Sequence, residues 1–233
     1  PIEALFTVDE ETGMSGANGL KQGLLSGDLL LNLDSEDEGE ICIGCAGGAD
    51  LKAVLKMTER AAPKGSTAVR VAVGGLKGGH SGVDIHLGRG NANKVLARVL
   101  TAARRELPMR LARFSGGDLR NAIPRSAEAI VVVAAKDGER LLACIAAVAK
   151  EITAELAAVD PDLTITTEKA RAPAKAISKP DSDRALAALV ASSARMPTGH
   201  SAQTGTPATN ACAMRLPPRA AVNSAIAPRY SGN

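Results

Sequence analysis

The middle of the chain carries the clearest periodic pattern of apolar residues. Valines alternate with other residues over 69–73, which predicts a β-strand with one buried face. Apolar residues then recur three and four positions apart over 91–107 and again over 139–159, the spacing of amphipathic helices. The second of these helices has its apolar stripe at Leu141, Ile145, Val148, Ile152, Leu156 and Val159.

Three more strands complete the pattern, at 111–114, 129–135 and 163–167. The resulting order, β-α-β-β-α-β, is that of the split βαβ sandwich, which is also called ferredoxin-like. We therefore predict an α+β fold. In it, residues 69–170 form a four-stranded antiparallel sheet with two helices on one face.

The first part of the chain has the pattern of an incomplete α/β sheet. Strands are predicted at 4–8, 28–34 and 40–45, with a short helix in the stretch 13–21, which is rich in Gly, Ala and Asn. Three strands joined by one short crossover look like the end of a larger domain.

We accordingly divide the chain into residues 1–47, a piece of that larger domain, residues 48–180, the sandwich, and residues 181–233. In the last part a helix could form at 185–194. The remainder is rich in Pro, Thr, Ala and Ser and has no periodicity. We expect it to be an irregular continuation of the sandwich domain.

Composition narrows the class of function. The chain has 233 residues, a net charge of +3 and 1% aromatic residues, so its core is aliphatic. Scarce aromatics and dispersed basic residues argue against nucleic acid as a partner, because single strands are bound by aromatic stacking. No apolar run reaches the roughly 18 residues of a membrane helix, and no secretory leader opens the chain. We expect a cytoplasmic protein without a membrane segment.

Two of the four cysteines have a spacing that can carry chemistry. Cys42 and Cys45 form a CxxC pair, as in redox and zinc motifs, while Cys144 and Cys212 stand alone. The pair lies in a strand-like run rather than at a helix start, and no second CxxC follows. We prefer reduced thiols of an intracellular protein, and a redox or zinc site is the alternative.

Carboxylates end two of the predicted strands. Asp9, Glu10 and Glu11 follow the first strand, and Asp34 follows the second. Oxygen donors at neighbouring strand ends suit a divalent metal, with one carboxylate left free as a base. The alternative is a solvated turn, since acids before a glycine are common in turns.

Two polar loops could supply further chemistry. The glycine-rich stretch 74–82 holds His80 without side-chain crowding, but it lacks the pattern of a phosphate-binding loop. Asn121 stands three residues before a proline, and its amide can donate and accept hydrogen bonds. Asp84 and His86 could join His80 in a metal site, although their spacing matches no standard ligand set. Taken alone, the local sequences fit a surface histidine and a simple turn.

The order of four motifs along the chain is more specific than any one of them. The motifs are DEETG at 9–13, NLDSE at 32–36, GGHSG at 78–82 and NAIP at 121–124. In this order they resemble the M20 family of di-zinc metallopeptidases. Within that family the chain looks most like the aminoacyl-histidine dipeptidases, through IGCAGG at 43–48 and the run 79–94. The resemblance covers roughly residues 1–170.

The resemblance implies a role for each matching residue. Glu10 would be the general base that takes a proton from the water between two zinc ions, and Glu11 and Asp34 would each bind one zinc. His80, on a lid, would stabilise the oxyanion of the tetrahedral intermediate. Asn121 would hold the carboxylate end of the substrate. The implied reaction is metal-dependent hydrolysis of dipeptides of the Xaa-His type, in a protein that could be a homodimer.

The resemblance also implies where the parts lie. Residues 1–47 would be the end of an α/β zinc-peptidase catalytic domain, and 48–180 its lid domain. Other metal ligands of the family, a His-x-Asp pair, a bridging aspartate and a final histidine, have no counterpart in the sequence. We therefore expect a fragment that is inactive alone, since each zinc takes about four ligands. The alternative is a non-catalytic binding or dimerisation module, built on the sandwich and its open strand edges.

Overall fold

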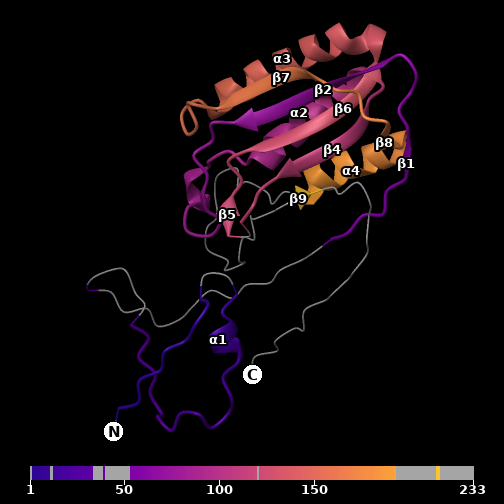
Figure 1. Cartoon of the computed structure of the whole chain (residues 1–233). Helices are drawn as coiled ribbons and strands as arrows, with labels where there is room; N and C mark the ends of the chain where they lie inside the picture. Colours follow the sequence, from indigo (N-terminus) through magenta and orange to yellow (C-terminus); the bar gives the residue numbers. More distant parts are fainter. Residues whose placement is uncertain are drawn as a thin grey trace. The chain divides into compact units, whose positions relative to one another are not determined.

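The computed structural model describes residues 2–10, 13–33, 39, 53–119, 121–192 and 214–215. The chain divides into two compact units, residues 1–46 and residues 47–233. Figure 1 shows that nearly all regular structure belongs to the second unit. Among the described residues of the first unit, α1 (Ser15–Asn18) is the only helix or strand.

The first unit differs in part from its prediction. α1 lies where the short helix is predicted, but residues 4–8 and 28–33 form no strand. Leu29 and Leu31 are 92% and 84% exposed, so the side chains of this apolar segment are not packed. A strand is stable only when neighbouring strands satisfy its backbone groups and cover its side chains, and no described segment pairs with residues 4–8 or 28–33 as a strand. The third predicted strand, 40–45, lies outside the described residues.

The second unit is built on one antiparallel sheet with the strand order β7-β2-β6-β4-β9. Its strands are β2 (Ser66–Gly74), β4 (Arg110–Gly116), β6 (Ala127–Ala134), β7 (Thr164–Ala170) and β9 (Met214–Arg215). The first four confirm the predicted four-stranded antiparallel sheet. β9 pairs with the end of β4 and lies in the part that the sequence predicts to be irregular.

Alternation of side chains gives the sheet its buried face. The inward residues of β2 are Val69, Val71 and Val73, which are at most 5% exposed. The register sets Val71 between Ala129 of β6 and Thr167 of β7. Neighbouring strands therefore send their own inward residues to the same side, as period-two patterning requires.

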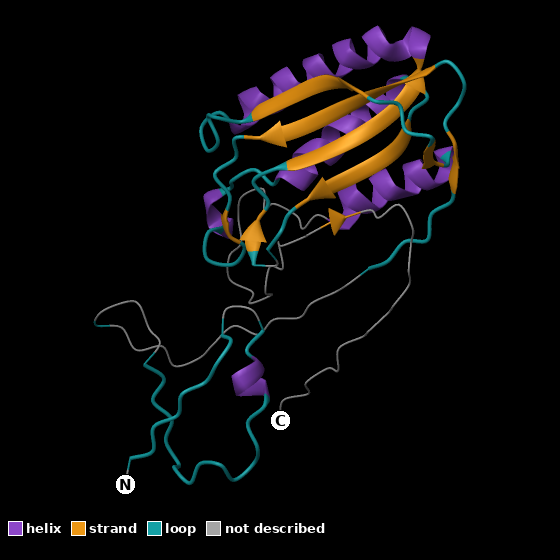
Figure 2. Cartoon of the chain, viewed as in Figure 1, coloured by secondary structure: helices purple, strands orange, loops and turns teal. Residues whose placement is uncertain are grey.

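Three helices pack on that face: α2 (Ala92–Glu106), α3 (Gly138–Leu156) and α4 (Lys179–Ser192). In Figure 2, α2 lies behind the sheet. α2 and α3 confirm the helices predicted at 91–107 and 139–159. The side-chain oxygen of Asn91 starts α2 by accepting hydrogen bonds from the N–H groups of Asn93 and Lys94, at 3.0 and 3.2 Å. A short 3₁₀ turn, η2 (Ala135–Asp137), leads into α3.

α4 adds to the sandwich a helix that the predicted β-α-β-β-α-β order lacks. It begins at Lys179, ahead of the predicted 185–194, and its Leu186 belongs to the main core. The hydroxyl oxygen of Ser178 accepts a hydrogen bond from the Asp181 N–H (3.3 Å) and so caps the first turn. A proline and an acid in that turn are further start signals.

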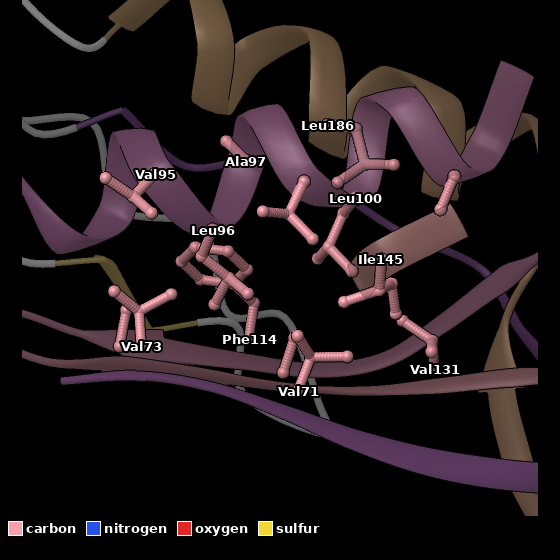
Figure 3. Packing of buried hydrophobic residues seen from close by; sticks show 14 of the residues in the cluster. Val71, Val73, Val95, Leu96, Ala97, Leu100, Phe114, Val131, Ile145 and Leu186 are labelled. Atoms are coloured by element: carbon pink, nitrogen blue, oxygen red, sulfur yellow. The ribbon is translucent and has the colours of Figure 1, made fainter. Parts of the chain in front are cut away.

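The core lies between the helices and the sheet. In Figure 3, Leu96 and Leu100 of α2 point toward the sheet residues Val71 and Phe114, with Ile145 of α3 beside them. All five are at most 1% exposed. Apart from Phe114 and Met109 the described core residues are aliphatic, as the composition predicts.

A two-stranded ribbon joins the sheet at β4. β1 (Glu59–Ala61) pairs antiparallel with β8 (Lys175–Ile177). The Arg110 guanidinium donates hydrogen bonds to backbone carbonyls on both strands, including Ala61 (2.9 Å) and Ala176 (2.6 Å). One side chain thus ties the segments that precede β2 and follow β7 to the same strand of the sheet.

Candidate functional site

The glycine-rich loop between β2 and α2 carries His80 on a short strand. β3 (Gly79–His80) pairs antiparallel with β5 (Ala122–Ile123). One step further, the Ser81 N–H donates a hydrogen bond to the carbonyl of Asn121 (2.8 Å). The structure therefore brings His80 and Asn121, two of the predicted site residues, onto paired backbone segments.

The His80 ring is oriented by backbone groups of its own loop. Its Nδ1 atom accepts hydrogen bonds from the N–H groups of Gly82 (3.1 Å) and Val83 (3.0 Å). The His80 N–H in turn donates to the Asp84 carboxylate (2.8 Å). Because Nδ1 accepts, the neutral ring carries its proton on Nε2, which is left as a donor. His80 is exposed, so this N–H group is available to a ligand.

Two glycines make room for this arrangement. Gly78 and Gly79 have φ values of +67° and +136°, which side chains with a Cβ rarely adopt. A Cβ at Gly79 would lie 2.5 Å from the Asp84 carboxylate and 2.6 Å from the Arg89 guanidinium. A Cβ at Gly78 would meet the Arg125 side chain. Glycine is therefore required at both positions for the loop to close around His80.

Asn121 presents its side chain from the neighbouring segment. The residue is exposed, and within the described part of the chain its amide makes no hydrogen bond. Its carbonyl is held by Ser81, so the backbone is fixed while the amide is open to solvent. An amide in this position can both donate to and accept from a ligand.

The predicted acids lie in the first unit or outside the described residues. Glu10 is exposed in a turn, and the preceding residue, Asp9, has a φ of +64°. The carbonyl of Asp9 accepts a hydrogen bond from the N–H of Met14 (2.6 Å), which closes this turn. Glu11 and Asp34, the predicted metal ligands, fall outside the described residues. Of the predicted site residues, the structure brings together His80 and Asn121.

The alternative metal site at His80, Asp84 and His86 is wrong. Within the described ranges, no three side chains of ligand type form a group that could hold a metal ion. The Asp84 carboxylate already binds the His80 N–H (2.8 Å) and lies 3.7 Å from the Arg89 guanidinium. The Nδ1 atom of His86 lies 2.8 Å from the carbonyl of Val83, to which it donates.

One cysteine of the four can be described. Cys144 is a free thiol on α3, and its pKa is raised, first by burial and then by the nearby Glu106. A raised pKa keeps the thiol protonated and unreactive. The CxxC pair, Cys42 and Cys45, and Cys212 lie outside the described residues.

Sequence reasoning missed a buried carboxylate beneath the His80 loop. Asp160 is fully buried and accepts hydrogen bonds from the N–H groups of Lys77 (2.8 Å) and Gly90 (2.6 Å). It follows the C-terminal end of α3, where the helix dipole disfavours an acid. No local pattern of residues shows that this acid is buried beneath the loop.

Comparison with known proteins places this loop within a known domain type. A family model, described as the peptidase dimerisation domain of M20 peptidases, matches residues 71–160 and includes the whole His80 loop. Residues 71–160 are therefore similar to an M20 peptidase dimerisation domain. The chain is 46% identical over 165 residues to the cytosol non-specific dipeptidase of Escherichia coli (strain K12). It also resembles the crystal structure of the aminoacylhistidine dipeptidase from Vibrio alginolyticus, with 41% identity and a TM-score of 0.73.

These two matches cover most of this chain but only part of each relative. They extend over 71% and 87% of the chain. The chain spans 34% of the Escherichia coli dipeptidase and 41% of the Vibrio alginolyticus chain. The predicted resemblance to M20 dipeptidases and the α+β fold of the dimerisation domain are confirmed. In the described residues, no helix has the length and apolar character needed to cross a membrane.

Proposed function

We propose that this chain acts in a cytoplasmic di-zinc metallopeptidase that hydrolyses dipeptides of the Xaa-His type. The relatives named a cytosol non-specific dipeptidase and an aminoacylhistidine dipeptidase support this reaction, compartment and substrate. The observation that carries the proposal is the His80 ring. Its Nδ1 atom is bound to two backbone N–H groups, so its Nε2–H group is a defined donor on an exposed loop of the M20 dimerisation domain.

His80 is proposed to stabilise the transition state. Attack of water on a peptide carbonyl places negative charge on the carbonyl oxygen. A hydrogen-bond donor that is already oriented stabilises this charge without reorganising during the reaction. The backbone contacts that fix the His80 tautomer and orientation suit that role, and the flanking glycines let the ring approach a substrate closely.

Asn121 is proposed to bind the terminal carboxylate of the dipeptide. Its amide N–H group can donate to a carboxylate oxygen, and its backbone is held by the pairing next to β3. A fixed anchor at this point positions the scissile carbonyl near His80, and such positioning accounts for much of an enzyme's rate enhancement.

Glu10 is proposed to be the general base. Its carboxylate accepts a proton from the attacking water and passes it to the leaving amine. Glu11 and Asp34 are proposed to bind one zinc ion each. Zinc, when bound, polarises the scissile carbonyl and makes water a stronger nucleophile at neutral pH. These three roles rest on the resemblance of the DEETG and NLDSE motifs.

A homodimer is the proposed assembly. The matched family model is that of a peptidase dimerisation domain. The sheet also ends in β7, whose outer edge has no partner strand among the described residues. An open edge of this kind can pair with a second copy of the chain.

The proposal is tested by assaying the protein expressed from its complete gene. It should hydrolyse Xaa-His dipeptides, lose activity to a chelator and regain it with zinc. Matched tripeptides ending in histidine serve as the control, because a site that anchors a dipeptide carboxylate rejects a longer chain. A folded, zinc-supplemented protein that cleaves no dipeptide would contradict the proposal and favour the non-catalytic dimerisation module.

A further inference from the structure

Asp160 is the one fully buried carboxylate among the described residues. It lies in the segment that connects α3 to β7, and its two carboxylate oxygens accept hydrogen bonds from different parts of the chain. Oδ1 accepts from the Lys77 N–H (2.8 Å) and Oδ2 from the Gly90 N–H (2.6 Å). Burying a carboxylate costs free energy unless hydrogen bonds replace its lost hydration, and these two bonds replace part of it.

The two donors stand at the two ends of the His80 loop. Lys77 precedes β3 and Gly90 follows the 3₁₀ turn η1 (Ile85–Leu87), so the loop between them contains His80. One carboxylate therefore closes the base of the loop and joins it to the end of α3. Holding both ends restricts the conformations that the loop can adopt.

The base of the loop is also tightly packed. A Cβ at Gly90 would lie 2.7 Å from the Leu76 side chain, 3.1 Å from Leu156 and 3.2 Å from the Asp160 carboxylate. Leu76 is itself 2% exposed. A larger side chain at Gly90 therefore has no room, and the Gly90 N–H, whose bond to Asp160 is buried, depends on the carboxylate as its acceptor.

We propose that Asp160 is a positioning residue for His80. The N–H groups of Gly82 and Val83 orient the ring relative to its own loop, and the Asp84 carboxylate holds the His80 backbone N–H. Asp160 fixes that loop relative to the sheet and α3. This inference goes beyond the proposed function. The expected effect on catalysis rests on the proposed function, whereas the expected effect on the position and tautomer of the His80 ring is independent of it.

Asp160→Asn is the informative substitution. An amide keeps the shape of the carboxylate but presents an NH₂ group to one of the two backbone donors. One of the two backbone N–H groups then loses its acceptor, and the base of the loop loosens. Asp181→Asn is the matched control. Asp181 is also a buried carboxylate, and it accepts from the Thr58 N–H (2.8 Å) and the Ser178 hydroxyl (2.9 Å), away from the His80 loop.

Nitrogen-15 NMR of the histidine rings in the full chain tests the structural part. The parent and Asp181→Asn should show His80 with its proton on Nε2. Asp160→Asn should shift the ring toward a mixture of tautomers and move the amide signals of Gly82 and Val83. If Asp160→Asn lowers the thermal stability but leaves these signals unchanged, the positioning role is wrong. Should that variant not fold, Gly90→Ala disturbs the same base with the carboxylate retained, and the same two outcomes decide.

Kinetics in the Xaa-His assay test the catalytic part. Asp160→Asn should lower kcat roughly 10- to 100-fold with less change in KM, since misplacing a catalytic group costs turnover. In a His80→Ala background the same substitution should cost little more, because both changes act through one group. Full additivity of the two losses would overturn the proposal. If the parent protein shows no dipeptidase activity, the proposed function fails, while the NMR comparison still decides the position of His80.

Discussion

At the scale of single residues, the orientation of His80 depends on backbone rather than side-chain partners. The ring nitrogen Nδ1 is bound by the N–H groups of Gly82 and Val83. The side chain that helps, Asp84, binds the backbone N–H of His80 and not its ring. The sensitive positions around His80 are therefore those that set the backbone conformation, above all Gly79.

Gly79→Ala should disrupt the His80 loop. The residue has a φ of +136°, and a Cβ would approach the Asp84 carboxylate to 2.5 Å and the Arg89 guanidinium to 2.6 Å. We expect the free energy of unfolding to fall by about 1–3 kcal/mol, the usual cost of such strain. Urea denaturation measures this loss.

Gly138→Ala is the matched control for that change. Gly138 has a φ of −57° in the helical region, and a Cβ there would make ordinary contact with Thr67 at 3.4 Å. It should be neutral or stabilise by up to about 1 kcal/mol. Equal losses in the two variants would show that the conformation of Gly79 is not special.

Asp181 should make stability depend on pH in acid. The pKa of its carboxyl is lowered, mainly because the carboxylate accepts the Thr58 N–H and then the Ser178 hydroxyl. A lowered pKa in the folded state means that the stabilisation is present above the unfolded pKa of about 4 and is lost as pH falls through the folded value. Asp181→Asn should flatten the stability curve in that acid range, as measured by denaturation at a series of pH values. An unchanged acid limb would contradict this assignment.

At the scale of helices and strands, strand predictions from apolar patterning were confirmed in the second unit but were wrong for two segments of the first. α2, α3 and the four central strands were predictable because their apolar stripes pack on one another within the second unit. The segments 4–8 and 28–33 have equally strand-like sequences but pair with no strand among the described residues. Local sequence encodes the tendency to form a strand, whereas the partner that stabilises it is a property of the rest of the molecule.

In the candidate site, too, some residues could be predicted from local sequence and others depend on contacts remote in sequence. The order of short motifs predicted His80 and Asn121, which the structure brings to paired segments. Asp160 was not predictable, because its importance arises from contacts with Lys77 and Gly90, both remote in sequence. Neither partner uses a side chain in these bonds, so no pattern of residue types records them.

α4 offers a test of how far the core extends. Leu186 is 3% exposed and lies in the main core, whereas Val190, on the same helix, is 47% exposed. Leu186→Ala should reduce the free energy of unfolding by about 2–5 kcal/mol through the cavity it leaves. Val190→Ala should change it by less than about 1 kcal/mol. Chemical denaturation that gave similar small losses for both would show that α4 is not part of the core.

At the scale of the whole molecule, the proposed chemistry is divided between the two units. His80 and Asn121 lie in the segment that matches the M20 dimerisation domain, while Glu10 lies in the first unit. In this proposal His80 supplies a hydrogen-bond donor to the substrate, and other residues bind the zinc. This division is the central claim, and it depends on His80 acting on the substrate rather than on the metal.

The most direct measurement is kcat for an Xaa-His dipeptide in His80→Ala, with zinc content determined on the same sample. Loss of the Nε2–H donor should lower kcat by about 10²–10³-fold while zinc content stays at the parental level. His86→Ala is the control, since this second histidine of the loop binds only the carbonyl of Val83 (2.8 Å) in the described structure, and its kcat should stay within a few-fold of the parent's. A His80→Ala protein that hydrolyses the dipeptide at the parental rate would contradict the account.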